Sequence, residues 1–155
     1  MQNEEKEDNL LNHFKWLKST FIITSLLLIL FWIYFFGIEC TDPNINPTYL
    51  AYEKAFPVPD LAWIVTLLLI SMIWLKNNEL KGIVSTIAAG SALVFLGLAD
   101  ISFNLTQGIY TQSVADGILN ITINLLSLFY GLTLVRTGYK LFIILTNKES
   151  LQPLK

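Results

Sequence analysis

The chain has 155 residues, of which 54% are hydrophobic and only 14% are charged. Because soluble domains carry about a quarter of their residues charged, this composition indicates an integral membrane protein of one domain. The net charge of −2 without a basic block argues against nucleic acid as a partner, and the single cysteine, Cys40, excludes an internal disulfide and paired-cysteine motifs.

The N-terminal region leads into a first membrane span. Residues 1–12 are acidic and polar, and we expect them to be mobile. The basic and aromatic residues that follow, up to position 18, fit a cytoplasmic membrane interface. Residues 20–38 carry no charge, and as a helix of roughly 28 Å they match the hydrocarbon thickness. An acidic start and the lack of a small-residue cleavage site favour a spanning helix over a signal peptide.

A polar connection and three more apolar segments complete the chain. Residues 39–60 contain four prolines, which prevent a continuous helix, although residues 48–56 can form two helical turns. The remaining apolar segments are predicted as a second span over residues 60–75, a third over 83–105 and a fourth over 117–135, which apolar residues up to 146 can extend, followed by a tail over 147–155.

The placement of Lys and Arg predicts the orientation. Lys54 lies in the connection over residues 39–60, and the other positive residues lie near the termini or in the turn over 76–82. These residues are Lys6, Lys15, Lys18, Lys76, Lys81, Arg136, Lys140, Lys148 and Lys155. The positive-inside rule then puts both termini in the cytoplasm. The predicted fold is all-α, an antiparallel bundle of four transmembrane helices.

Polar residues interrupt the apolar spans near their outer ends. Asp100 lies roughly 25 Å above the start of the third span, just below the outer edge of the hydrocarbon core, and Asn104 follows one turn later. Asn120 and Asn124 lie at similar depth in the fourth span, and Asp60 begins the second. A carboxylate at membrane depth is costly and usually faces a protein interior or a water-filled cavity.

Helical spacing arranges small and polar residues in one stripe on each of the last two spans. The stripes are Thr86, Gly90, Leu93, Gly97, Asp100 and Asn104 on one span, and Gly117, Asn120, Asn124, Ser127 and Gly131 on the other. Small residues let membrane helices approach closely and amides hydrogen-bond across the contact, so we expect the stripes to face each other. The asparagines can then be interhelical contacts rather than ligand contacts, and Asp60 can be a helix N-cap. Packing alone does not require the charge of Asp100.

The segment Asn46-Pro47-Thr48-Tyr49-Leu50-Ala51-Tyr52-Glu53-Lys54-Ala55-Phe56-Pro57-Val58-Pro59-Asp60 resembles a segment of small, uncharacterised prokaryotic four-helix membrane proteins. The shared element is an Asn-Pro pair followed by a Phe-Pro-x-Pro-Asp sequence that leads into the second helix. This resemblance implies a fold and no activity. The layout of four spans is also similar to that of the emopamil-binding and sigma-2-receptor class, which implies a ligand cavity between helices. The acidic residues of this chain do not match that class position by position.

The first functional hypothesis is a binding or accessory membrane protein. An outward-facing polar cavity between the second, third and fourth spans would bind a lipid headgroup or a small cationic ligand, with no metal or cofactor. Its candidate residues are Asp100, Asn104, Asn120 and Asn124, with Asp60 and Trp63 at the entrance. The alternatives are an ion- or proton-coupled transporter acting as a homo-oligomer, an isomerase-like enzyme using Asp60 and Asp100, and a structural subunit without a ligand.

Overall fold

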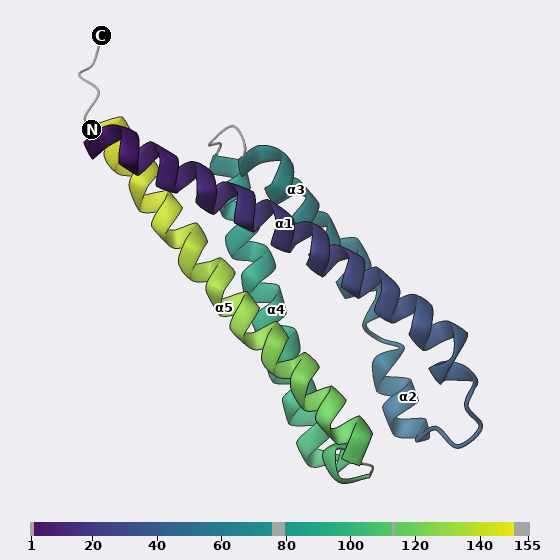
Figure 1. Ribbon diagram of the computed structural model, residues 1–155. Helices are drawn as coiled ribbons and strands as arrows, with labels where there is room; N and C mark the ends of the chain where they lie inside the picture. Colours follow the sequence, from purple (N-terminus) through teal and green to yellow (C-terminus); the bar gives the residue numbers. More distant parts are fainter. Residues whose placement is uncertain (1, 76–79, 113, 151–155) are drawn as a thin grey trace. The chain divides into compact units, whose positions relative to one another are not determined.

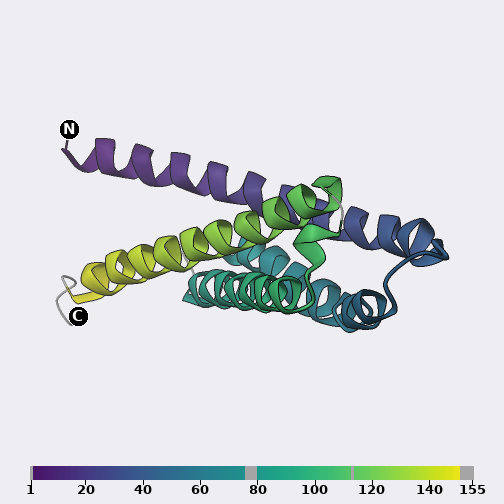
Figure 2. The same cartoon turned by 90° about the horizontal axis from the view of Figure 1, so that it is seen from below.

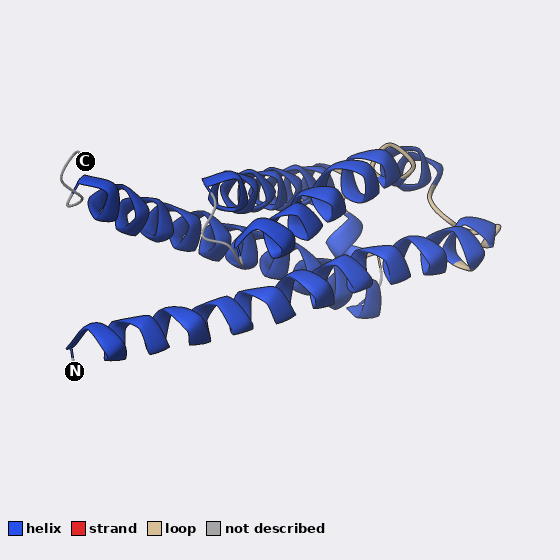
Figure 3. Ribbon diagram, turned by 90° about the horizontal axis from the view of Figure 1, so that it is seen from above, coloured by secondary structure: helices blue, strands red, loops and turns tan. Residues whose placement is uncertain are grey.

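The computed structural model describes residues 2–75, 80–112 and 114–150, and every regular element in these ranges is helical (Figures 1 and 3). The elements are α1 (Gln2–Gly37), η1 (Glu39–Thr41), α2 (Pro47–Glu53), η2 (Pro59–Val65), α3 (Thr66–Leu75), α4 (Leu80–Thr106), η3 (Ile109–Thr111) and α5 (Val114–Ser150). The chain divides into two compact units, Met1–Gly82 and Ile83–Lys155. Each unit is described by itself.

Three helical segments are long and apolar enough to cross a membrane. They are Trp16–Thr41, Leu80–Thr106 and Gly117–Asn147. Each is at least 26 residues long, which at about 1.5 Å per residue exceeds the roughly 30 Å of a hydrocarbon core. The predicted first, third and fourth spans are therefore long apolar helices. The predicted second span lies in a shorter apolar helix, Pro59–Leu75.

Two helices run beyond the predicted spans. α1 begins at Gln2, within the acidic segment that we expected to be mobile. Glu and Lys are good helix formers, so the helix of the first span can continue through this segment. α5 runs through position 138 to Ser150, so the helix of the predicted fourth span continues past residue 135. The predicted turn over residues 76–82 falls partly outside the described residues.

In the first unit, α1 packs against α3 and against η2, a π-helical segment (Figure 1). The buried side chains of α1 recur at steps of three, four and seven residues, which gives the helix one packed face: Leu17, Phe21, Ser25, Trp32 and Phe35. The buried residues of η2 and α3 are Asp60, Ile64, Val65, Leu67, Leu68, Ser71 and Leu75. Most of the other apolar side chains of α1 from Trp16 onward are exposed, as lipid-facing residues of a membrane helix are.

The connection between α1 and η2 contains α2, the two-turn helix expected between the prolines. Asn46 caps it, because its Oδ1 accepts hydrogen bonds from the backbone N–H groups of Thr48 and Tyr49 at 2.9 and 3.4 Å. Pro47 occupies the first helical position, where a missing N–H costs nothing. The Tyr49 hydroxyl donates to Oε1 of Glu39 at 3.2 Å and so joins α2 to η1.

In the second unit, α4 and α5 form an antiparallel hairpin whose contact is built on glycine. A Cβ placed on Gly90 would lie 2.7 Å from the carbonyl oxygen of Gly131, and one on Gly131 would lie 2.7 Å from that of Gly90. Seven residues further along α4, a Cβ on Gly97 would lie 3.1 Å from the carbonyl oxygen of Asn124. The backbones of the two helices therefore touch at contacts repeated every seven residues. We call this line of contacts the glycine seam.

Candidate functional site

The polar candidates of the second unit lie at the end of the glycine seam nearest the α4–α5 connection. Asn104 follows Gly97 by seven residues, and Gly117 precedes Asn124 by seven, so both lie on the helix faces that form the seam. Asn104 and Asn124 are only 3% and 2% exposed. The expectation that the two stripes face each other is confirmed where Gly90 meets Gly131 and where Gly97 meets Asn124.

Asp100 and Asn120 lie at about the same height along the axis of the α4–α5 hairpin. Asp100 lies three residues beyond Gly97 on α4, and Asn120 lies four residues before Asn124 on α5. In antiparallel helices, these steps move about 5 and 6 Å in the same direction from the contact between Gly97 and Asn124. Both side chains are half-buried. We call the set Asp100, Asn104, Asn120 and Asn124 the outer polar layers.

The buried amide of Asn124 has a partner outside both helices. Its Nδ2 donates a hydrogen bond to the hydroxyl oxygen of Tyr110 at 2.9 Å. Tyr110 lies in η3, the short 3₁₀ turn of the connection, and is half-buried. Tyr110 was not among the residues predicted from the sequence, because a tyrosine in a polar connection has no helical spacing that would relate it to an amide fourteen residues away.

The connection that carries Tyr110 is fixed at several points. Gly108 has φ of 65°, a left-handed conformation that favours glycine, and the Thr111 hydroxyl donates to its carbonyl at 2.8 Å. Ile109 is 4% exposed. The backbone carbonyl of Tyr110 packs directly against Gly117, where a side chain would not fit. Figure 2 shows η3 folded beside the first turns of α5. Tyr110 is thus held by both backbone packing and its bond to Asn124.

Asp60 and Trp63 belong to the first unit, and their surroundings differ. Asp60 is 6% exposed, and its Oδ2 accepts a hydrogen bond from Nε1 of Trp32 at 3.0 Å. The backbone N–H of Asp60 already donates to the carbonyl of Phe56 at 2.9 Å, and the cap position of η2 is Val58. The prediction that Asp60 caps this helix is therefore wrong: its carboxylate joins η2 to α1. Trp63 is 60% exposed.

Trp32 lies among the aromatic residues near the end of α1 and also forms a hydrogen bond to η2. Its ring contacts Phe31, Phe35 and Phe36, with centroids 5.0 to 5.8 Å away. Trp32 is 3% exposed, so its indole N–H needs a buried acceptor, and Asp60 supplies one. No spacing rule predicts from the sequence that Trp32 and Asp60 form a pair, because 28 positions separate them.

The side chains of the outer polar layers can form hydrogen bonds and supply a negative charge. Their functional groups are one carboxylate, three primary amides and, through Asn124, one phenol. Among the side chains that the structure describes, no three of His, Cys, Asp or Glu are grouped to bind a metal ion. Comparisons with protein-family models, with curated proteins and with solved structures find no match for the chain.

Proposed function

We propose that this protein is a membrane protein with four transmembrane helices and both termini in the cytoplasm. Its function would be to bind a small cationic ligand or a lipid headgroup at the outer polar layers. Three long apolar helices support membrane insertion. The apolar helix Pro59–Leu75 supplies the fourth crossing, because a short span is tolerated by local thinning of the bilayer at a modest cost.

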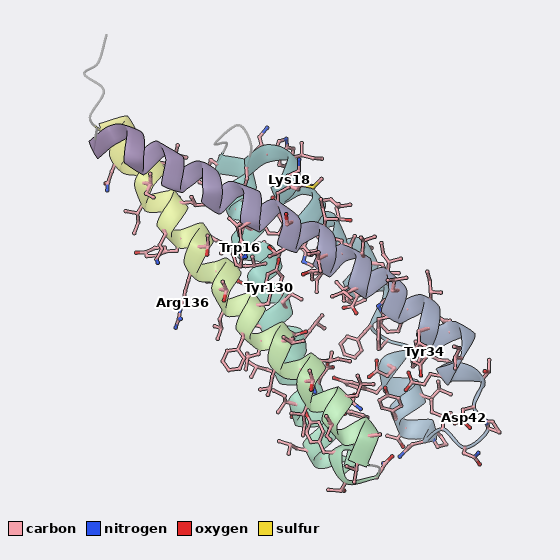
Figure 4. All side chains as sticks on the ribbon, in the orientation of Figure 1. Trp16, Lys18, Tyr34, Asp42, Tyr130 and Arg136 are labelled. Carbon is pink, nitrogen blue, oxygen red and sulfur yellow. The ribbon has the colours of Figure 1, made fainter. Side chains whose placement is uncertain are left out.

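The distribution of positive charge supports the orientation. Arg136 projects from the side of α5 and is exposed, as are Lys18 of α1 and Lys81 at the start of α4 (Figure 4). Each of them flanks the uncharged run of its helix on the proposed cytoplasmic side. The opposite ends carry Asp42, in the connection between α1 and α2, and Lys54 as the only positive residue of the sequence there. The positive-inside rule favours this arrangement over its inverse.

The observation that carries the binding proposal is the change in the composition of the seam along its length. Around Gly90 and Gly131, the contact is made by backbone and apolar side chains such as Leu134 and Val94. Toward the α4–α5 connection, the same line continues with amides and a carboxylate. Close helix packing explains the glycines and the amides, but it does not require Asp100. An ionisable residue inside a membrane span most often marks a binding site or pathway.

A structural subunit without a ligand is the second candidate, and the bond between Asn124 and Tyr110 favours it. In that case, the outer polar layers stabilise the hairpin and do nothing else. The transporter hypothesis would require polar groups along the whole seam. At the other end of the seam, Gly138 lies against Ile83 and Ile87, which offer none.

Thermal unfolding of the purified protein with a panel of lipids and cationic small molecules tests the proposal. A ligand at 100 times its Kd stabilises the folded state by about 2.7 kcal/mol. The wild type should show such a shift, and Asp100→Asn should lose it. Asp42→Asn is the matched control, because Asp42 is exposed and its carboxylate accepts a hydrogen bond from the nearby backbone N–H of Asn44. If no compound stabilises the wild type, the binding proposal is wrong and the structural role remains.

A further inference from the structure

We propose that the first unit binds the phosphate headgroup of an anionic phospholipid at the end of α3 that lies away from Asp60. The site consists of Lys18 on α1, Trp74 on α3 and Lys81 at the start of α4, and we call this set the basic cluster. Residues 80–82 belong to the first unit, so the whole cluster lies within it. The basic cluster is separate from the outer polar layers and does not depend on them.

The hydrogen bond between Trp32 and Asp60 relates the positions along α1 to those along α3. α1 runs antiparallel to the helical stretch of η2 and α3 and packs against it (Figure 1). Lys18 lies fourteen residues before Trp32, and Trp74 lies fourteen residues after Asp60. Because the two stretches run in opposite directions, both steps lead about 20 Å toward the same end of the unit. Figure 4 shows Lys18 on the part of α1 beside the end of α3.

Close packing holds Lys81 beside Trp74. A Cβ on Gly82 would lie 2.5 Å from the backbone nitrogen of Leu75 and 2.8 Å from the carbonyl carbon of Trp74. The first turn of α4 therefore crosses the end of α3 in backbone contact. The Nζ atom of Lys81 lies 5.4 Å from the centroid of the Trp74 ring, which is the distance of a cation–π interaction. Trp74 thus positions one of the two ammonium groups.

The basic cluster is accessible at the level of the lipid headgroups. Lys18 and Lys81 are exposed, and Trp74 is half-buried. The uncharged run of α1 begins directly after Lys18, and that of α3 ends one residue after Trp74. Lysine and tryptophan at the ends of apolar helices lie at the membrane interface, so both ammonium groups are placed where lipid phosphates are.

The charge around the cluster favours an anion. α1 from Trp16 onward, α3, and α4 up to Ala99 contain no acidic residue, and the sequence between α3 and α4 holds one lysine and one glutamate. The last acidic residue before Lys18 is Asp8, which precedes it by ten residues, or about 15 Å of helix. That separation exceeds the Debye length of about 8 Å at physiological ionic strength.

The neighbouring apolar surface favours a lipid over a soluble phosphate. Ile22 lies one helical turn beyond Lys18 and is 39% exposed, and Ile73, next to Trp74, is 59% exposed. A phospholipid bound through its phosphate can lay its acyl chains along these side chains, which a soluble phosphate ester leaves uncovered. A basic site between membrane helices is the type of site that binds anionic headgroups.

Binding of matched lipids to the purified protein in a neutral detergent, measured by native mass spectrometry, tests the proposal. The pair is phosphatidylglycerol and phosphatidylcholine with identical acyl chains, so that the lipids differ in headgroup charge alone. We expect the wild type to bind phosphatidylglycerol at least tenfold more tightly than phosphatidylcholine. Glycerol 3-phosphate, which has the phosphate without the acyl chains, should bind at least tenfold more weakly than phosphatidylglycerol.

The variants separate a defined site from total charge. Lys18→Gln and Lys81→Gln should each lower the ratio of the two lipid affinities about fivefold, whereas Lys140→Gln, at an exposed lysine of α5, should keep it. Trp74→Leu changes no charge but releases Lys81, and it should lower the ratio at least twofold. Trp63→Leu, at an exposed tryptophan of η2, is its control. A purely structural loss weakens both lipids equally and leaves the ratio unchanged.

Three results would overturn the proposal. The first is equal binding of the two lipids by the wild type. The second is an equal loss of the ratio in Lys81→Gln and Lys140→Gln, which would show that the lipid responds to total charge and not to the basic cluster. The third is binding of glycerol 3-phosphate as tightly as phosphatidylglycerol, which would make the ligand a soluble phosphate ester. A Trp74→Leu variant that keeps the full ratio overturns the positioning role of Trp74, and if this variant does not fold, Lys81→Gln still decides whether the site exists.

Discussion

The glycine seam can be tested with the smallest possible perturbation, Gly131→Ala. The added Cβ would lie 2.7 Å from the carbonyl oxygen of Gly90 and 2.9 Å from both the backbone nitrogen and Cγ2 of Val94. Two of these three atoms belong to the backbone of α4, so no side-chain rotation can relieve the contact. The two helices must separate locally, and the packing on both sides of the new methyl group loosens.

Two opposing effects set the size of the change. Alanine in place of glycine gains about 1 kcal/mol of helix propensity, whereas overpacking of a close contact costs about 1–3 kcal/mol. Because the neighbouring atoms are backbone, we expect the cost near the top of that range and a net destabilisation of about 2 kcal/mol. Gly37→Ala is the control, since no atom lies within 4 Å of a Cβ at that position. It should change stability by less than about 0.5 kcal/mol.

Reversible unfolding in mixed detergent and SDS micelles measures both variants. The double variant Gly90→Ala with Gly131→Ala should cost less than the two single changes together, because one separation of the helices makes room for both methyl groups. If Gly131→Ala is as stable as the wild type, or gains stability like an unhindered alanine, the backbone contact between α4 and α5 is not as close as the structure has it.

Two further predictions concern the first unit and the topology. Trp32→Phe removes the indole donor from the buried carboxylate of Asp60 and should destabilise the protein by about 1–3 kcal/mol, whereas Trp63→Phe, at an exposed position, should change the unfolding free energy little. Equal effects of the two substitutions would mean that the bond to Asp60 is not stabilising. Cys40, the single cysteine, should react with a membrane-impermeant maleimide in intact cells, and a Lys140→Cys variant lacking Cys40 should react only after permeabilisation. The opposite pattern would reverse the proposed orientation.

The long helices and the facing stripes could be predicted because each depends on local pattern alone. Uncharged runs of sufficient length mark apolar helices, and a step of three or four residues puts Gly90 and Gly97 on one face of α4. A short connection then makes α4 and α5 antiparallel neighbours, so the face of one helix predicts the face of the other. The contact between Gly97 and Asn124 follows from these rules.

The side-chain hydrogen bonds of Asp60 and Asn124 could not be predicted, because each joins residues of separate elements that no helical periodicity relates. Asp60 accepts from Trp32 of another helix, within a π-helical segment whose hydrogen-bond register differs from that of an α-helix. Asn124 donates to Tyr110, whose position depends on the left-handed conformation of Gly108. A buried polar group requires a partner, and that rule predicts that bonds exist but not which residues make them.

The residues along the glycine seam show which positions close packing requires and which it leaves open to polar side chains. The close contacts of the hairpin are all made at glycines: Gly138 packs against Ile87, Gly131 against Gly90, Gly97 against the backbone of Asn124 and Gly117 against the backbone carbonyl of Tyr110. At Gly138, the side chain of Ile87 fills the space that the glycine leaves.

An isoleucine fills one such space, so an apolar side chain of similar size would serve packing as well as an amide does. Replacing a buried polar pair by apolar groups of the same shape is often neutral for stability. Packing can therefore use the amides at 104 and 124 without requiring them, and we propose that the carboxylate at 100, which packing does not require, is explained by what it binds.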